Sequence, residues 1–306
     1  MELVLFEDLI IRIVSNSLQS PQEIFLVDKI LRNPHSVILA SDRLFNHVRK
    51  SLPRTLFEEL DRFVLSLKDT SIHNVLWCPD NTQGADFEDE FDYLMSLTKS
   101  NFAFGLSYSR QLCRSKDGTG KRWKLASIAL SKKPNRHWLM TQLAANHPDP
   151  VITNCQDFSD AHKVTKFFRV ALQLPKELAD VKVFDRFVNL DHDRLAGLSE
   201  FRSIEFYTFR DRWKPSDFRR KIDSINSKFS GARVFTVQDR VFFLHGRSIV
   251  IGDLVIWADN DFANLNPGKH QDWRIAVQLS KAESQRLLDS CAHFTIHHNS
   301  HDEDMG

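Results

Sequence analysis

A histidine and an arginine stand two residues apart between two apolar segments near the C-terminal end of the chain. Residues 241–244 read Val-Phe-Phe-Leu, the triplet His245-Gly246-Arg247 follows, and Ile249-Val250-Ile251 completes the pattern. Side chains two positions apart project to the same face of an extended chain. An arginine there can hold an anionic oxygen while the imidazole attacks or transfers a proton. The spacing predicts an anion site in a core strand pair.

A basic, polar segment at residues 113–136 is a second place where the residue types suit a ligand. It carries Trp123, and Trp138 follows it. Clustered Lys and Arg beside aromatic rings suit the backbone groove of a nucleic acid, and a flexible basic loop without a partner explains the same composition. Arg210 and Arg212, in a charge-alternating turn, are candidate rim cations for the His245 site. The candidate nucleic-acid contacts in the segment are Lys121, Arg122, Lys124, Lys132, Lys133 and Arg136.

Composition restricts the class of protein that these residues can belong to. The length of 306 residues suggests two domains of roughly 150 residues each. The formal net charge of +1 excludes a general polyanion binder, so that a nucleic-acid surface has to be a local patch. The 4 cysteines lie far apart and indicate reduced thiols. No apolar segment approaches the roughly 18 residues of a membrane span, which predicts a soluble cytoplasmic protein without a membrane partner.

Apolar segments alternate with helical patterns in the N-terminal half. This alternation favours an α/β class, here a three-layer domain with parallel strands. We assign it residues 1–145, with the basic segment 113–136 as a loop. The expected strands are residues 3–5, 36–40, 75–78 and 101–106. The expected helices are residues 9–14, 21–31, 42–48, 56–67 and 87–97, the second and third with Ser20 and Ser41 at their N-termini.

The sequence Asn146-His-Pro-Asp-Pro150 interrupts this pattern and begins a linker or connecting helix at residues 146–174. The pattern restarts after Pro175 and predicts an α+β domain at residues 175–296, followed by a polar tail at 297–306. The expected strands are 181–184, 204–209, 232–235, 241–244, 249–251, 254–257 and 273–279. The expected helices are 215–229 and 281–288.

The order of these elements, the triplet His245-Gly246-Arg247 and the downstream Asn264 and Asn266 resemble a single phospholipase D-like domain. The resemblance implies that His245 is the nucleophile, that Arg247 stands in the position of the family's phosphate-holding lysine, and that Asn264 helps to bind the phosphate. Arginine retains anion binding because its guanidinium can hold phosphate through two hydrogen bonds. No cofactor is expected at this site.

The chain departs from the family pattern in two places. Gly252 occupies the position of the motif's aspartate, with Asp253 one residue later, and segment 259–264 lacks the Gly-Ser pair. The family also uses two histidines, so that one copy per chain implies a homodimer or no chemistry. If Arg247 is instead buried against a structural carboxylate, the phosphate site fails.

The N-terminal domain resembles a PIN-like nuclease domain, in which carboxylates at the ends of a parallel sheet bind Mg²⁺ or Mn²⁺. The matching positions are Glu7 or Asp8 after the first expected strand, Asp42 after the second, and Asp86 or its neighbours Glu88, Asp89 and Glu90 at the acidic helix. The expected metal ligands are therefore Asp8, Asp42 and Asp86. The acidic segment is explained more simply by a solvated helix start, where the helix dipole favours carboxylates.

Together these observations predict a nucleic-acid-directed nuclease or phosphodiesterase, of a kind used in bacterial defence or mobile-element DNA processing. Its partners would be DNA or RNA and other proteins of the same system. The alternative is a catalytically degenerate adaptor that binds protein partners or nucleic acid without cleavage, because both motifs are incomplete.

Overall fold

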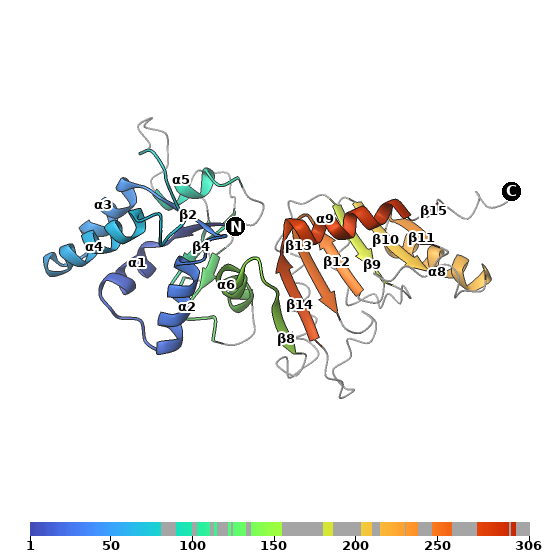
Figure 1. Cartoon of the computed structure of the whole chain (residues 1–306), viewed down its shortest axis with the longest axis horizontal. Coiled ribbons are helices and arrows are strands. Elements are labelled where there is room, and N and C mark those ends of the chain that lie inside the picture. The colour runs from blue at the N-terminus through green and yellow to red at the C-terminus, as the bar shows by residue number, and fades with distance from the viewer. Residues whose placement is uncertain are drawn as a thin grey trace. The chain divides into compact units, whose positions relative to one another are not determined.

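The chain forms two compact units, Met1–Pro148 and Asp149–Gly306, each built around its own sheet (Figure 1). The computed structural model describes residues 1–80, 90–99, 103–110, 113–114, 122–123, 125–132, 136–154, 180–185, 203–209, 215–229, 231–237, 247–258, 274–293 and 295–297. The predicted α/β class is confirmed. The predicted end of the first domain at residue 145 falls just before the division between the units.

The sheet of unit 1 is parallel throughout, with the strand order β3-β2-β1-β4-β7. The strands are β1 (Glu2–Leu5), β2 (Val37–Ala40), β3 (Val75–Trp77), β4 (Ala103–Ser107) and β7 (Leu125–Ser127). The central strands are apolar and buried on both faces, as a parallel sheet requires. The prediction of a loop throughout 113–136 is wrong, because β7 is a buried strand of this sheet and β5 (Cys113–Arg114) pairs with β6 (Arg122–Trp123).

Two helices of unit 1, α2 and α3, begin where the sequence places capping residues. Ser20 Oγ accepts a hydrogen bond from the Glu23 amide at 3.3 Å, and Ser41 Oγ accepts one from the Leu44 amide at 3.1 Å. Helix α2 contacts α6, whereas α1 contacts α3 and α4. The helices are α1 (Glu7–Val14), α2 (Pro21–Leu31), α3 (Asp42–Ser51), α4 (Phe57–Lys68), α5 (Glu90–Ser96) and α6 (Arg136–Asn146), with a short 3-10 turn, η1 (Arg54–Leu56), before α4.

Gly105 of β4 is required by the close approach of α5. A Cβ atom at this position would lie 2.5 Å from Cζ of Phe91 and 3.0 Å from Cδ1 of Leu125. The Phe91 ring is buried and packs on Phe6, with ring centroids 3.8 Å apart. We therefore expect Gly105→Ala to lower the free energy of unfolding by about 1–3 kcal/mol, measured by chemical denaturation. Adding Phe91→Leu should restore part of the loss, and an unchanged transition in Gly105→Ala would contradict this packing.

The sheet of unit 2 is mixed, with the order β15-β11-β10-β9-β12-β13-β14-β8. Strands β9, β10 and β11 are parallel to one another, and every other pair is antiparallel. The predicted linker 146–174 contains β8, which forms an edge of this sheet. The strands are β8 (Val151–Asn154), β9 (Asp180–Phe184), β10 (Ser203–Phe209), β11 (Arg233–Val237), β12 (Arg247–Ile251), β13 (Leu254–Ala258), β14 (Arg274–Leu279) and β15 (Thr295–His297).

The two faces of this sheet carry different helices. Helix α9 (Lys281–Ser290) lies across one face (Figure 1), where Leu287 packs into a cluster with Phe184, Tyr207 and Val255. A 3-10 turn, η6 (Cys291–His293), follows it. Beyond α8 (Pro215–Lys228), Phe229 packs on Phe206, which projects from the opposite face. No described helix is long and apolar enough to cross a membrane.

The expected strand pair around the triplet at 245–247 is replaced by a different hairpin. Strand β12 begins at Arg247, and its two neighbours are β9 and β13. The turn that joins β12 to β13 is Gly252-Asp253, with Gly252 at φ +56°, a left-handed conformation that glycine adopts without strain. Ile249–Ile251 therefore pair with β9 and β13, and the predicted pairing with residues 241–244 is wrong for them. His245 and Gly246 lie outside the described residues.

Candidate functional site

A row of four polar side chains crosses four adjacent strands of unit 2. In the register, Thr208 of β10 lies opposite Thr236 of β11. Asp185 follows the last residue of β9 that pairs with β10 and β12, and Arg247 stands at the corresponding position of β12. Asp185 thus continues the row between Thr208 and Arg247. We call these residues, Asp185, Thr208, Thr236 and Arg247, the polar row.

The polar row is unusual because the next row on the same face of these four strands is apolar. Side chains at alternating positions share a face, so the row below consists of Val183, Phe206, Val234 and Ile249, all buried. In the polar row, Asp185 and Thr208 are each 1% exposed and Thr236 is 2% exposed. Burying polar groups costs free energy that an apolar row would not cost. Core packing alone does not require buried polar side chains, so their presence in an apolar face indicates a role other than packing.

The polar row lies at the edge of the sheet where the parallel strands β9, β10 and β11 end. From β9 the chain adds β10 and β11 on one side, and β12 then lies on the other side of β9. In open α/β sheets, ligands bind at the carboxyl ends of parallel strands, where the strand order changes direction. The position of the row is therefore that of a ligand site.

Arg247 and Asp185 form a buried ion pair within the row. Arg247 Nε lies 3.4 Å from Asp185 Oδ1, and the two side chains are 12% and 1% exposed. The Asp185 amide also donates to the Tyr207 carbonyl oxygen at 3.1 Å, which fixes the backbone that carries the carboxylate. The cation expected to hold phosphate is thus buried against a carboxylate. A carboxylate partner counts against phosphate binding at Arg247, because it offsets the positive charge of the guanidinium.

The other residues predicted for this site, His245, Asn264, Arg210 and Arg212, lie outside the described residues. The strand ends that flank them are described. Residues 210–214 follow the end of β10, residues 238–246 connect β11 to Arg247, and residues 259–273 connect β13 to β14. Because of the strand directions, all of these strand ends are at the edge that carries the polar row. The described strand ends from which these segments leave therefore lie at one edge of the sheet.

Asp253, the nearest substitute for the family's motif aspartate, lies at the other end of β12. It is an exposed residue of the turn between β12 and β13. The full length of β12 separates it from Arg247, so that Asp253 is not part of the polar row.

In unit 1, the predicted metal ligands have other partners. Asp8 accepts hydrogen bonds from Ser107 Oγ at 2.8 and 3.0 Å and from the Ser109 amide at 3.1 Å. Asp42 is exposed, and its Oδ1 lies 3.5 Å from Lys68 Nζ. Asp86 lies outside the described residues.

A divalent cation would bind the carboxylate oxygens, which here face hydrogen-bond donors at Asp8 and an ammonium group at Asp42. Within the described part of the chain, no group of three or more His, Cys, Asp or Glu side chains could hold a metal ion. Glu90 of the acidic helix is buried, accepting from Ser41 Oγ at 2.7 Å and lying 3.2 Å from Arg43 Nε. A carboxylate with these partners stabilises the end of β2 and the start of α5.

Of the predicted nucleic-acid contacts in segment 113–136, the structure describes the side chain of Lys132. Its Nζ lies 3.1 Å from Oε1 of the buried Glu23. Arg122 lies in β6 and Arg136 begins α6, while Lys121, Lys124 and Lys133 lie outside the described residues. The structure therefore assigns Lys132 a carboxylate partner.

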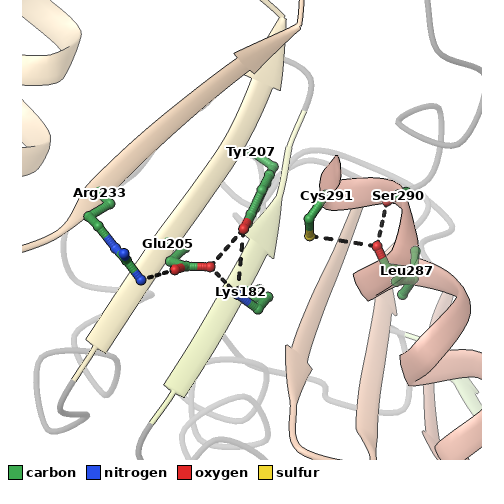
Figure 2. A network of polar contacts seen from close by, with 7 residues as sticks. All are labelled: Lys182, Glu205, Tyr207, Arg233, Leu287, Ser290 and Cys291. Carbon is green, nitrogen blue, oxygen red and sulfur yellow. Dashed lines mark hydrogen bonds and ion pairs between the residues drawn. The ribbon is translucent and has the colours of Figure 1, made fainter. Parts of the chain in front are cut away.

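A second polar network, not predicted from the sequence, lies on the opposite face of the unit 2 sheet (Figure 2). Glu205 of β10 lies opposite Lys182 of β9 and Arg233 of β11 in the register, and its carboxylate pairs with both cations. Tyr207 donates its hydroxyl hydrogen to Glu205 Oε2 at 2.7 Å. The alternating pattern of residues 181–184 and 204–209 predicts two half-buried strands but not which residues are neighbours. Only the register shows that Lys182 and Glu205 meet.

The environment of this network changes the proton affinity of its members. Burial raises the pKa of Glu205, but hydrogen bonds from Lys182 and Tyr207 and the charges of Lys182 and Arg233 outweigh it, so that the net pKa is below the ordinary value of 4.5. Burial raises the pKa of Tyr207, and its contacts with Cys291 and Glu205 raise it further. Burial likewise raises the pKa of the Cys291 thiol. A protonated thiol and phenol beside a satisfied carboxylate indicate a structural network.

Comparisons with known proteins give limited similarity. No family model matches the chain, and no curated protein matches it. Among solved structures, NucT from Helicobacter pylori is similar at 6% identity and a TM-score of 0.35, over 47% of this chain and 93% of that chain. Nuc from Salmonella typhimurium, a phospholipase D family member, is similar at 10% identity and a TM-score of 0.33, over 49% and 100% of the two chains. Phosphatidylserine synthase from Haemophilus influenzae is similar at 10% identity and a TM-score of 0.32, over 49% and 39%.

Proposed function

We propose that unit 2 binds a phosphodiester of a nucleic acid at the polar row and that the protein acts as a nuclease or phosphodiesterase. The observation that supports this most is the polar row itself, which interrupts an apolar sheet face at the carboxyl ends of three parallel strands. Arg247 supplies the only cation of the row, and His245 stands two residues before it in the chain.

In this proposal the residues have separate tasks. Arg247 holds a phosphate oxygen, and the paired Asp185 weakens this attraction because it offsets the charge of the guanidinium. His245 attacks phosphorus and displaces one ester oxygen, which takes a proton from the histidine of a second copy of the chain and leaves as an alcohol. Water then hydrolyses the phosphohistidine and returns the histidine. Asn264 assists by donating to the phosphate, and a second copy of the chain supplies the second histidine.

The Arg247–Asp185 pair favours a second candidate, an adaptor that binds without cleavage. A guanidinium already paired with a buried carboxylate attracts a phosphate less strongly than an isolated one. Such a protein would retain the fold and a weak phosphate contact and would recruit nucleic acid or protein partners.

Cleavage and binding assays with matched variants separate these candidates. Labelled single- and double-stranded DNA and RNA would be incubated with the full chain in Mg²⁺, Mn²⁺ or EDTA. Nuclease function predicts cleavage that persists in EDTA and is lost in His245→Ala. Arg247→Lys should weaken binding, because lysine cannot form the paired hydrogen bonds of a guanidinium.

Asp8→Ala tests the other domain: cleavage in EDTA should be unaffected, whereas cleavage that needs Mg²⁺ or Mn²⁺ and is lost in Asp8→Ala would place the reaction in unit 1. Binding that depends on Arg247 without any cleavage would establish the adaptor. Absence of both binding and cleavage would overturn the nuclease and an adaptor for nucleic acid, and would leave an adaptor for proteins.

A further inference from the structure

A cavity of about 460 Å³ in unit 1 lies between α2, α6 and residues 128–132. Its size is within the range of small-molecule sites, which measure about 300–1,000 Å³. Its lining combines aromatic, cationic and buried acidic side chains: Glu23, Phe25, Lys29, Lys132 and Trp138. These residues are separate from the polar row of unit 2.

Glu23 is the buried acid of this cavity. The residue is 3% exposed, and its Oε2 accepts a hydrogen bond from the Gln19 amide at 2.7 Å as part of the N-terminal cap of α2. Its Oε1 lies 3.1 Å from Lys132 Nζ. Among the described residues, no donor meets hydrogen-bond geometry with this oxygen. Because buried oxygens are nearly always hydrogen-bonded, Oε1 has the capacity to accept an N–H group from a ligand.

Two aromatic side chains line the same cavity. Phe25 projects from α2 with 69% of its surface exposed, although most large apolar side chains of unit 1 are buried. Trp138 of α6 is half-buried and lines the cavity from the other helix. An exposed ring beside a pocket provides a flat apolar surface on which a planar heterocycle can stack.

Two ammonium groups stand at the cavity. Lys132 is 56% exposed, and Lys29 Nζ donates to Asn146 Oδ1 at 2.6 Å, which holds it beside α6. With Glu23, the lining carries two positive charges and one negative charge. A ligand that complements this set has an anionic group, a planar ring and an N–H donor.

We propose that this cavity binds a nucleotide. The base stacks on Phe25 beside Trp138 and donates an N–H group to Glu23 Oε1, and the phosphate contacts Lys29 and Lys132. The same chemistry is offered by a free mononucleotide and by an unpaired nucleotide in a single strand. The proposal does not depend on phosphodiester binding by unit 2.

Calorimetric titration of the full chain with GMP, AMP, CMP and UMP tests the site. At least one nucleotide should bind, and Phe25→Ala should weaken its binding about fivefold or more, the lower end of the effect of removing one base-stacking ring. Ile24→Ala is the matched control, because Ile24 lies on the same helix, is 48% exposed and does not line the cavity. Tighter binding of a single-stranded tetranucleotide would assign the site to nucleic acid, and equal or weaker binding would assign it to free nucleotides.

Glu23→Gln tests the base contact separately from folding. Glutamine keeps an oxygen for the Gln19 amide, so that the helix cap survives, but it removes the negative charge. Nucleotide binding should weaken relative to the binding of ribose 5-phosphate, which has no base. The proposal is overturned if none of the four nucleotides binds at millimolar concentration, or if Phe25→Ala and Ile24→Ala bind alike. It is also overturned if binding is lost in Arg247→Lys and not in Phe25→Ala, which would place the nucleotide in unit 2.

Discussion

Arg247→Met is expected to lower the free energy of unfolding by about 3–5 kcal/mol, the usual cost of removing one partner of a buried ion pair. The cost arises because Asp185, which is 1% exposed, would keep its charge without the guanidinium that pairs with it. Methionine retains much of the volume of the arginine stem, so that loss of packing contributes little. Chemical denaturation followed by circular dichroism measures the change.

The double variant Arg247→Met, Asp185→Asn shows whether the cost comes from the carboxylate. Removing both charges should recover a large part of the loss, because no uncompensated charge remains. If the double variant is as unstable as the sum of the two single variants, the two residues do not form a coupled pair.

Glu205→Gln is expected to lower the free energy of unfolding by about 3 kcal/mol at neutral pH, since it removes the carboxylate that pairs with Lys182 and Arg233. Lys182 is 25% exposed and would lose the anion that compensates its burial. Glu283→Gln is the control: Glu283 pairs with Arg286 on the surface of α9, where a pair contributes at most about 1 kcal/mol.

The pH dependence of this difference has a definite sign. The pKa of Glu205 in the folded protein is below its ordinary value of 4.5. Its stabilising contribution is therefore complete above that ordinary value and is lost as the pH falls through the lower, folded-state pKa. Denaturation at pH 7 and at about pH 3 should show the gap between the natural protein and Glu205→Gln narrowing in acid. A gap of constant size would contradict the ionised network.

The elements that the sequence predicts well are those with strong local signals. Helix α2 begins at Pro21 after the cap at Ser20, and α3 follows the cap at Ser41, as their sequences predict. The apolar segments of β1, β2 and β12 to β14 are also found as strands. Strand β7 was missed because its three residues, Leu125–Ser127, stand inside a basic segment whose composition indicates a loop.

Pairing between distant segments could not be predicted in the same way. The periodicity of residues 249–251 shows a strand but not its neighbours, and β9, more than sixty residues earlier in the chain, occupies one side of β12. For the same reason Asp185 was not expected beside Arg247, nor Glu205 between Lys182 and Arg233. Each of these pairs depends on register, which is set by the packing of the whole sheet rather than by local sequence.

Phosphodiester binding through Arg247 at the polar row is checked by measuring the dissociation constant of a single-stranded oligonucleotide for Asp185→Asn at fixed salt concentration. Asparagine removes the charge that competes for the guanidinium, so that the natively folded variant should bind about tenfold more tightly, a gain of about 1.4 kcal/mol. Asp180→Asn makes the same charge change at the exposed, opposite end of β9 and controls for general electrostatic attraction. Unchanged or weaker binding by folded Asp185→Asn, relative to Asp180→Asn, would contradict the phosphate site and leave Arg247 with a structural role alone.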